Sequence, residues 1–314
     1  MKILVIGAAG QIGSELTPEL RRRYGNENVI GADIRPPPSP ELEEGPFIHL
    51  DVTKREDLER ALFTHNIDTI YHLAAVLSAK GERDPVFTWE VNLGGLWNVL
   101  EAARCNGVKR IFWPSSIAVF GPRTPKEATP QETILDPTTI YGVTKVAGEH
   151  LCAYYRRRYG LDIRGVRYPG IISSRTLPGG GTTDYAVEMF HAALRGEEYT
   201  CFVEEDTVLP MMYIKDAIEA AIRLMEAPAE RLRYPVNYNV TAMSFSAGEL
   251  ADEIRRYIPG FRCRFVPDYR QEIAATWPRT IDDAPAREDW GWAPRYDLSS
   301  MVEEMIRELR KHLP

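Results

Sequence analysis

Tyr141 and Lys145 are the two residues whose types and spacing most directly suggest chemistry. They lie four positions apart in a segment that reads as one long helix, Tyr141–Tyr159, so both side chains are expected on the same helical face. A free tyrosine has a pKa of about 10 and is a poor base at neutral pH, but a lysine ammonium one turn away favours the phenolate and lowers that pKa. The pair is therefore suited to taking a proton from an alcohol while a hydride leaves carbon.

Two serines support this interpretation, which the helical spacing alone does not establish because it is common on amphipathic helices. Ser115 and Ser116 follow a predicted strand, Lys109–Trp113, at the carboxyl edge where ligands bind in open α/β sheets. A serine hydroxyl at this edge can hold the substrate oxygen that Tyr141 protonates or deprotonates. A turn or helix cap would use the same residues, and the sequence does not decide which serine contacts the substrate.

A glycine-rich loop, GAAGQIG at residues 7–13, lies between a predicted strand, Lys2–Ile6, and a predicted helix, Gln11–Tyr24. In this context we expect Gly7 to permit a tight turn, Gly10 to let the backbone approach a pyrophosphate, and Gly13 to let the helix pack closely on the strand. The free N–H groups of the helix N-terminus are suited to phosphates. The loop predicts a dinucleotide site that includes Gly7, Gly10, Gln11, Ile12 and Gly13.

Asp33 ends the next predicted strand, Asn28–Asp33, about 20 residues after the loop. A carboxylate at that point accepts hydrogen bonds from the adenosine ribose and repels a 2′-phosphate, so NAD is favoured over NADP. Arg35, two positions on, would soften that preference. Asp51 and Val52 follow the third strand, where adenine edges lie in such folds. Leu73, Ala74 and Ala75 come at the end of the fourth, where small residues let the chain pass close to the cofactor or, nearly as well, belong to the ordinary core.

Strand-like and helix-like segments alternate through the first half of the chain. The remaining expectations are strands at Phe47–Leu50, Thr69–Leu73 and Asp162–Arg167, helices at Lys54–His65 and Trp89–Asn106, and a surface loop at Arg35–Pro46. Strict alternation with continuously apolar strands predicts an α/β fold, a doubly wound parallel sheet of the NAD-binding Rossmann type.

The second half is less regular and predicts a smaller C-terminal substrate lobe. Helices are expected at about Asp184–Leu194, Lys215–Met225, Ser246–Tyr257 and Leu298–His312. We divide the chain into an NAD-binding domain at residues 1–170, joined by about 207–240, and a substrate-binding lobe that takes up most of 171–314, interleaved with the first.

Composition excludes several classes of function. The 314 residues carry a formal net charge of −7, which disfavours binding to nucleic acid or to anionic membranes. No apolar run is long enough to cross a bilayer. The four cysteines are scattered without a Cys-x-x-Cys pair, so we expect reduced thiols in a cytoplasmic protein, and no metal site.

Together these motifs resemble the extended short-chain dehydrogenase/reductase family, the NAD-dependent epimerase/dehydratase family, over essentially the whole chain. The resemblance implies that Lys145 also binds the nicotinamide ribose and that Ser116 is the catalytic serine. It implies that Asn92 supports the site, and that Tyr168 and Ile171 lie beside the nicotinamide. It also implies a homodimer, formed through the helices at Trp89–Asn106 and Tyr141–Tyr159.

The sequence from Arg167 onward resembles the branch of this family formed by the short-chain L-threonine 3-dehydrogenases. The segments that carry this likeness are residues 167–172, 178–187, 199–202, 209–213, 277–278, 281–283 and 286–290. The branch implies NAD-dependent oxidation of the L-threonine 3-hydroxyl to 2-amino-3-ketobutyrate without zinc. It is an oxidoreductase activity of threonine catabolism.

A small zwitterionic substrate agrees with the polar residues near the start of the helix at about Asp184. Hydroxyls and free N–H groups there suit a carboxylate, and Asp184 would pair with an ammonium or cap the helix. The substrate candidates are Ser78, Ser116, Tyr141, Thr182, Thr183, Asp184 and Trp277, although a lone tryptophan is usually core. The PGGG segment at residues 178–181 suggests a mobile lid.

Two alternatives remain. A sugar-nucleotide 4-epimerase or dehydratase would use the same Tyr/Lys/Ser core, but such enzymes usually carry asparagine where Pro169 stands. A noncatalytic dinucleotide-binding redox sensor would commonly have lost the tyrosine, so an intact Tyr141 and Lys145 argue against it.

Overall fold

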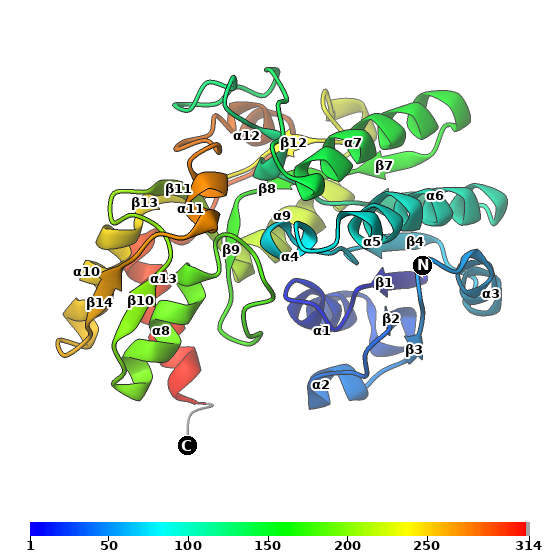
Figure 1. Cartoon of the computed structure of the whole chain (residues 1–314). Helices are drawn as coiled ribbons and strands as arrows, with labels where there is room; N and C mark the ends of the chain where they lie inside the picture. Colours follow the sequence, from blue (N-terminus) through cyan, green and yellow to red (C-terminus); the bar gives the residue numbers. More distant parts are fainter. Residues whose placement is uncertain (312–314) are drawn as a thin grey trace.

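Six parallel strands form the central sheet of the computed structural model, which describes residues 1–311 (Figure 1). Their order is β3-β2-β1-β4-β5-β7, with bounds Phe47–His49, Val29–Asp33, Ile3–Ile6, Thr69–His72, Arg110–Phe112 and Asp162–Arg164. The chain order reverses between β1 and β4, so a crevice opens at their carboxyl ends. This topology confirms the predicted doubly wound α/β fold.

Helices cover both faces of this sheet because alternate residues of its strands point to opposite sides. Ile3 and Val5 of β1 join the core that holds α1, Gly13–Tyr24, and α9, Ile214–Glu226. Leu4 and Ile6 join the core under α3, α6 and α7, which span Arg55–His65, Gly95–Cys105 and Ile140–Tyr159. The strands are therefore buried on both sides, which explains their continuous apolar sequences.

The helix expected at Trp89–Asn106 is built from three pieces. A short helix α5, Pro85–Trp89, runs into a π-helical turn, Glu90–Gly94, and then into α6. The long helix α7 begins one residue before the expected Tyr141, where the Thr139 hydroxyl accepts a hydrogen bond from the Gly142 N–H at 3.0 Å. That cap fixes the start of the helix just ahead of Tyr141.

The single strand expected at Asp162–Arg167 is wrong, because the chain changes sheets at Gly165. A Cβ at Gly165 would overlap the carbonyl oxygen of Trp113, so only glycine allows this approach. Beyond it, β8, Val166–Tyr168, lies between β6, Ser115–Ser116, and β12, Tyr238–Asn239, in a separate three-stranded sheet. This small sheet carries both candidate serines.

The second lobe lies to the left in Figure 1. Its sheet has the order β13-β11-β9, spanning Met243–Ser246, Val208–Tyr213 and Gly170–Ile172, and β10, Tyr199–Cys201, pairs with β14, Cys263–Phe265. Helices α8, α10 and α13, at Tyr185–Arg195, Ala247–Tyr257 and Leu298–Arg310, pack on one another. The four helices expected in this half are present within two residues, except that the expected end at 312 lies outside the described residues.

Several short elements were not expected. They are α2 at Pro40–Glu43 within the predicted loop, α4 at Ser78–Gly81, α11 at Tyr269–Ala274, α12 at Ala284–Trp290, and single 3₁₀ turns at Asn26–Asn28, Ile117–Val119 and Ala229–Arg231. Within residues 1–311, no helix has the length and apolar character needed to span a membrane.

Candidate active site

The glycine loop forms a tight cradle at the switch point of the main sheet. Gly7 has a positive φ of 86°, and a Cβ there would lie 2.6 Å from the Ala74 nitrogen. A Cβ at Gly13 would overlap the Gly7 carbonyl oxygen, so α1 packs directly on the loop. A Cβ at Gly10 would lie 3.2 Å from the Gly7 carbonyl oxygen and within 4 Å of no other atom that the structure describes outside its own chain neighbours. The loop therefore has the close packing and open face that suit a pyrophosphate.

Asp33 closes this cradle from β2. Its carboxylate is buried and accepts hydrogen bonds from the backbone N–H groups of Ala9 and Arg35, each at 3.0 Å. The Arg35 guanidinium turns back to donate to the Ala9 carbonyl oxygen at 2.9 Å and lies 3.5 Å from the Asp33 carboxylate. The arginine is thus bound to the loop beside the carboxylate.

The segments after β3 and β4 approach the same edge. Asp51 accepts hydrogen bonds from the N–H and hydroxyl of Thr53, and Asn98 of α6 donates to the Val52 carbonyl oxygen at 2.9 Å. The Leu73 N–H donates to the Ile6 carbonyl oxygen, which places residues 73–75 against the glycine loop. The structure brings these sequence-predicted residues together.

Tyr141, Ser116 and Lys145 meet at the junction of α7 and β6. The Ser116 hydroxyl lies close enough to the Tyr141 hydroxyl to act on its pKa. The Lys145 ammonium is buried, donates to the Pro114 carbonyl oxygen at 2.6 Å, and lies 4.6 Å from the centre of the Trp113 ring and 5.5 Å from that of Tyr141.

Ser115 points the other way. Its hydroxyl donates to the Glu149 carboxylate at 2.6 Å, and its side chain is buried. Successive strand residues face opposite sides, so of the two serines the structure brings only Ser116 to Tyr141.

The expected lowering of the Tyr141 pKa is wrong for this arrangement. Burial raises the pKa of Tyr141 to about 12, against the opposing effect of the Ser116 hydrogen bond. Burial also lowers the pKa of Lys145 to about 8, although Cys152 and Glu149 act to raise it. The ammonium lies over the tyrosine ring and is bonded to Pro114, so desolvation of the phenolate dominates.

The residues to which the family resemblance assigns a role, Asn92, Tyr168 and Ile171, each make hydrogen bonds within the structure. Asn92, in the π-helical turn, bonds to both the N–H and the carbonyl of Val76 and contacts Thr144 of α7. It therefore ties the loop after β4 to the catalytic helix. The Tyr168 hydroxyl is buried and donates to the Ala217 carbonyl oxygen at 2.6 Å. The Ile171 carbonyl oxygen accepts a hydrogen bond from the Gln11 side chain at 3.2 Å, which crosses between the lobes.

The candidate substrate residues meet where the second lobe contacts α4. The Ser78 and Thr182 hydroxyls are 3.0 Å apart and buried. Asp184 accepts hydrogen bonds from the Gly180 and Gly181 N–H groups, both at 2.8 Å, and makes no side-chain cap to α8. The capping alternative is therefore wrong, because the carboxylate turns back to the glycine segment. Burial raises the pKa of Asp184.

Thr183 and Trp277 are placed less directly at the site. Thr183 packs against Gly170: a Cβ added at Gly170 would lie 2.9 Å from the methyl carbon of Thr183. Trp277 is buried in the main hydrophobic core, 5% exposed.

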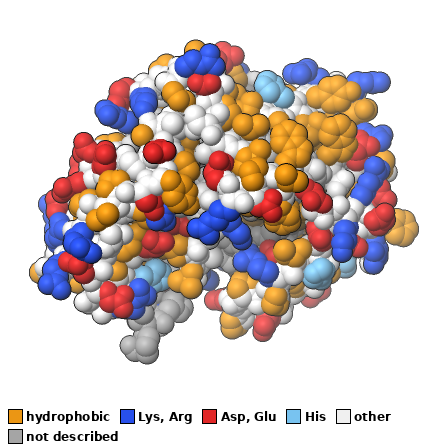
Figure 2. Space-filling view, in the orientation of Figure 1, with side chains coloured by type: hydrophobic (Ala, Val, Ile, Leu, Met, Phe, Trp, Pro, Cys, Tyr) orange, Lys and Arg blue, Asp and Glu red, His pale blue; other side chains and the backbone are white. Residues whose placement is uncertain are grey.

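The glycine segment at residues 179–181 rests on α4, where Lys80 donates its backbone N–H to the Gly180 carbonyl oxygen at 3.1 Å. A pocket of about 200 Å³ lies beside this contact. Its lining is Ala79, Lys80, Arg83, Gly179, Gly180, Gly181, Tyr269 and Arg270. Figure 2 shows Lys and Arg side chains beside the hollow between the two lobes.

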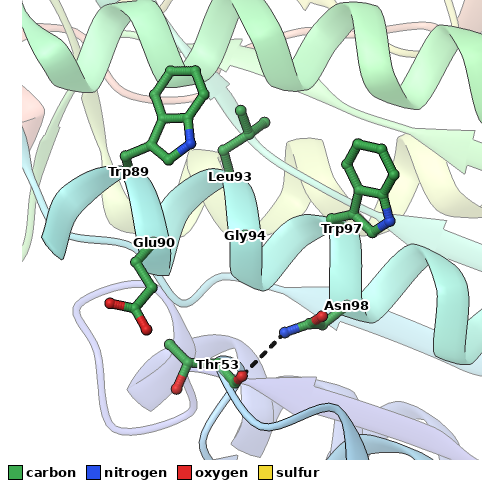
Figure 3. Close-up of a pocket in the computed structure, with 7 residues that line it drawn as sticks. All are labelled: Thr53, Trp89, Glu90, Leu93, Gly94, Trp97 and Asn98. Atoms are coloured by element: carbon green, nitrogen blue, oxygen red, sulfur yellow. Dashed lines mark hydrogen bonds between the residues drawn. The ribbon is translucent and has the colours of Figure 1, made fainter. Parts of the chain in front are cut away.

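A second pocket, of about 310 Å³, lies on the outer side of the π-helical turn and α6. Figure 3 shows Trp89, Leu93 and Trp97 projecting from one side of this helical stretch, whereas Glu90 and Asn98 approach Thr53 on the other. None of its lining residues belongs to the glycine loop or to the cluster of Tyr141, Ser116 and Lys145.

A doubly wound sheet with a glycine cradle at its switch point, and a Tyr/Ser/Lys cluster at its carboxyl edge, defines a dinucleotide-dependent enzyme. The family model of the NAD dependent epimerase/dehydratase family matches residues 3–241, and the chain belongs to this family. Its cofactor is NAD, which the cradle and Asp33 fit.

The relatives extend over the full chain. An uncharacterized epimerase/dehydratase of Staphylococcus haemolyticus is 48% identical, over 99% of this chain and 98% of that protein. A GalE-like L-threonine dehydrogenase from Cupriavidus necator, solved in its holo form, is 52% identical with a TM-score of 0.95, over 98% of this chain and 100% of that one. A monomeric L-threonine 3-dehydrogenase from a metagenome is 50% identical with a TM-score of 0.95, over 99% of both chains.

Proposed function

We propose that this enzyme oxidises the 3-hydroxyl of L-threonine with NAD to give 2-amino-3-ketobutyrate, NADH and a proton. The observation that carries the proposal is the likeness to L-threonine dehydrogenases, at 50% and 52% identity, which includes the second lobe as well as the cofactor lobe. Bound NAD supplies the hydride acceptor. The chain's own residues must then position the alcohol and accept its proton.

In this proposal Ser116 holds the threonine hydroxyl and Tyr141 takes its proton, because the two side chains lie close together where α7 meets β6. Lys145 supplies the positive charge that favours a phenolate in the transition state. With its pKa lowered to about 8, Lys145 is mostly cationic at pH 7. Ser115 is excluded from direct contact by its bond to Glu149.

The substrate carboxylate is proposed to meet the Ser78 and Thr182 hydroxyls, which are buried and 3.0 Å apart. Thr183 and Asp184 complete this wall, with Asp184 ordering the glycine segment through its two hydrogen bonds. Trp277 supports the wall from the core. The glycine segment is proposed to act as a lid that excludes water.

We also propose that residues 1–170, with about 207–240, act as the NAD-binding domain and that most of the chain from 171 forms the substrate lobe. Support comes from α9, which packs against α1, β5 and β8 although it follows the first strands of the second lobe. A cytoplasmic location remains part of the proposal, and the four cysteines are free.

A homodimer through α5, α6 and α7 is proposed as the assembly. Large apolar side chains on this surface are exposed, namely Val86, Phe87, Trp89, Trp97, Val143 and Tyr154. Figure 2 shows hydrophobic side chains gathered where Figure 1 places α7. A patch of this kind usually marks an interface.

The test is NADH formation with L-threonine, L-serine and a panel of simple alcohols, combined with detection of aminoacetone, the decarboxylation product of 2-amino-3-ketobutyrate. We expect L-threonine to be the best substrate. Absence of L-threonine-dependent NADH would refute the substrate, and tight binding of UDP would instead favour a sugar-nucleotide enzyme.

A further inference from the structure

Glu149 is a buried carboxylate on the same face of α7 as Tyr141 and Lys145. It lies one helical turn beyond Lys145, which itself lies one turn beyond Tyr141. Its side chain is only 4% exposed. A buried carboxylate needs partners for its charge and its lone pairs, so those partners show what the residue does.

Four hydrogen bonds satisfy this carboxylate. Arg167 donates from Nε and Nη2 to the two carboxylate oxygens, both at 2.8 Å, while Ser115 donates to Oε1 at 2.6 Å and Asn237 to Oε2 at 3.0 Å. Ser115 belongs to β6, Arg167 to β8, and Asn237 immediately precedes β12. One side chain of α7 therefore binds two strands of the small sheet and the residue that leads into the third.

The network reaches further into the same sheet. Arg167 also donates to the Gln131 carbonyl oxygen and to the Asn239 side chain, and Gln131 bonds back to Asn237 and Asn239. The guanidinium donates four hydrogen bonds and the carboxylate accepts four, so neither group can shift without breaking several of them. A paired buried network of this kind fixes one arrangement of the elements that it joins.

The consequences converge on the catalytic cluster. Because Glu149 holds Ser115, it also restrains the next residue of the strand, Ser116, which lies near Tyr141. The residue before Ser115 is Pro114, whose carbonyl oxygen accepts the Lys145 ammonium. A single register of residues 114–116 against α7 therefore places both partners of the catalytic pair.

Electrostatics act in the same direction. The titratable or charged groups around Lys145 are Tyr141, Glu149 and Cys152 on α7, His72 on β4, and Arg167 on β8 through its pair with Glu149. Burial lowers the pKa of Lys145, and Cys152 and Glu149 oppose that. Burial raises the pKa of the Cys152 thiol, which is neutral near pH 7, so Glu149 is the standing negative charge.

We infer that Glu149 is a positioning residue for the proposed dehydrogenation: with Arg167 it fixes the register of residues 114–116 against α7, and so places Ser116 and the Pro114 anchor of Lys145 beside Tyr141. The inference rests on the proposed function for its kinetic readout, whereas its structural readout does not.

Glu149→Gln removes the charge and keeps the size and an acceptor for Ser115. We expect kcat to fall by roughly 10- to 100-fold, as for small misplacements of catalytic groups, with little change in KM. The pH limb that reports Lys145 should move to lower pH, because the opposing charge is gone. Glu149→Asp keeps the charge at a shorter reach, and should restore the position of that limb but not the full kcat.

Asp162→Asn is the matched control. Asp162 is a carboxylate of β7 that pairs with Arg110, Arg156 and the buried Arg164, away from the site. Its loss should lower stability without changing the pH profile. If Glu149→Gln does not fold, Glu149→Leu with Arg167→Met replaces the pair by apolar groups, a change that often preserves folding. That double variant should be stable but slow.

Crystal structures of the variants give a test that needs no substrate. The Ser116–Tyr141 contact should be lost or lengthened in Glu149→Gln or in the double variant, and kept in Asp162→Asn. A contact that is unchanged, or a kcat and pH profile equal to those of the wild type, overturns the inference. If the wild type is inactive with L-threonine, the proposed function is refuted instead. The positioning role of Glu149 is then tested by the crystal structures alone.

Discussion

The Lys145 ammonium donates a 2.6 Å hydrogen bond to the Pro114 carbonyl oxygen, immediately before the two serines. The lysine is thereby anchored to the strand that presents Ser116, and its charge acts on Tyr141 across the ring face at 5.5 Å from the ring centre. Burial sets the direction of both pKa shifts: it raises the pKa of Tyr141 and lowers that of Lys145.

Tyr141→Phe should retain NAD binding and lose most turnover. The ring and its packing remain, but the proton acceptor is gone, and general-base catalysis typically contributes about 10²- to 10⁴-fold. Steady-state NADH formation and a separate NAD titration measure the two properties. Tyr159→Phe, at the far end of the same helix, is the control. Turnover within a few-fold of the wild type would remove Tyr141 from the role of base.

The pH profile of kcat/KM should rise with pH to about 8 and then stay level toward 12. The active form needs a Tyr141 phenolate with a Lys145 ammonium, so one proton must be lost from the pair. The pKa values of about 8 for Lys145 and about 12 for Tyr141 bound the range in which the pair has lost one proton. Rates between pH 6 and pH 10 test this. A decline through pH 8 would contradict it.

Lys145→Met should slow the reaction and stabilise the fold at neutral pH. The pKa of Lys145 is lowered on folding from 10.5 to about 8, so the unfolded chain binds more protons between those values. Stability from this group therefore rises with pH from about 8 to 10.5, and its cost below pH 8 is up to about 3 kcal/mol.

After loss of the Pro114 hydrogen bond, the net gain for Lys145→Met should be on the order of 1 kcal/mol at pH 7. The cost of the buried ammonium disappears as the pH rises, whereas the Pro114 hydrogen bond stays lost, so the gain should fall with pH and become a net loss of stability by pH 10.5. Denaturant unfolding at both pH values measures the free energy of unfolding of the variant minus that of the wild type. A difference that is smaller at pH 7 than at pH 10.5 would contradict this account.

Gly180→Ala should change kcat and KM together. Gly180 has a φ of 95°, which strains an alanine, and its carbonyl oxygen joins the glycine segment to Lys80. Gly179→Ala, without that strain, should act in the same direction but less. Gly107→Ala is the matched control, because Gly107 has a φ of 69° in open space. Unchanged kinetics in both lid variants would argue against a lid.

Trp97→Lys should convert the proposed dimer to a monomer, because it places a charge in the exposed apolar surface of α6. Analytical ultracentrifugation of the wild type and the variant measures this. Phe63→Lys alters a more exposed aromatic side chain on α3 and should leave the mass unchanged. A monomeric wild type would place this chain with its monomeric metagenome relative.

The sequence predicts the structure best at positions where the residue types allow only one backbone arrangement. The spacing of Gly7 and Gly13, with Asp33 after the next strand, leaves little choice of turn, and the structure shows the close approach that it implies. The small sheet was not predictable, because β6 and β12 have only two residues each and carry no periodicity. The change of sheets at Gly165 depends on a contact with Trp113 that no local pattern records.

For the candidate site, the sequence indicates which residues to consider better than it indicates their hydrogen bonds and pKa shifts. Spacing alone placed Tyr141 and Lys145 on one face, but desolvation depends on the whole fold, so the direction of the Tyr141 pKa could not be read from the sequence. Glu149 was missed, although its position one turn after Lys145 was a signal. For Asp184 the sequence left open an ammonium partner or a helix cap, and only the folded loop shows its glycine partners.

The hydrogen bond from Gln11 to the Ile171 carbonyl oxygen, with the Ser14–Thr176 contact beside it, joins the cofactor loop to the start of the second lobe. We therefore expect movement of that lobe on binding of the proposed amino-acid substrate to act on the glycine loop, the proposed site of the NAD phosphates. The affinities for the two ligands are then thermodynamically linked, and the linkage is reciprocal. NAD should bind the enzyme with a different affinity when the amino-acid site is filled, by the same factor that NAD changes the affinity for the amino acid.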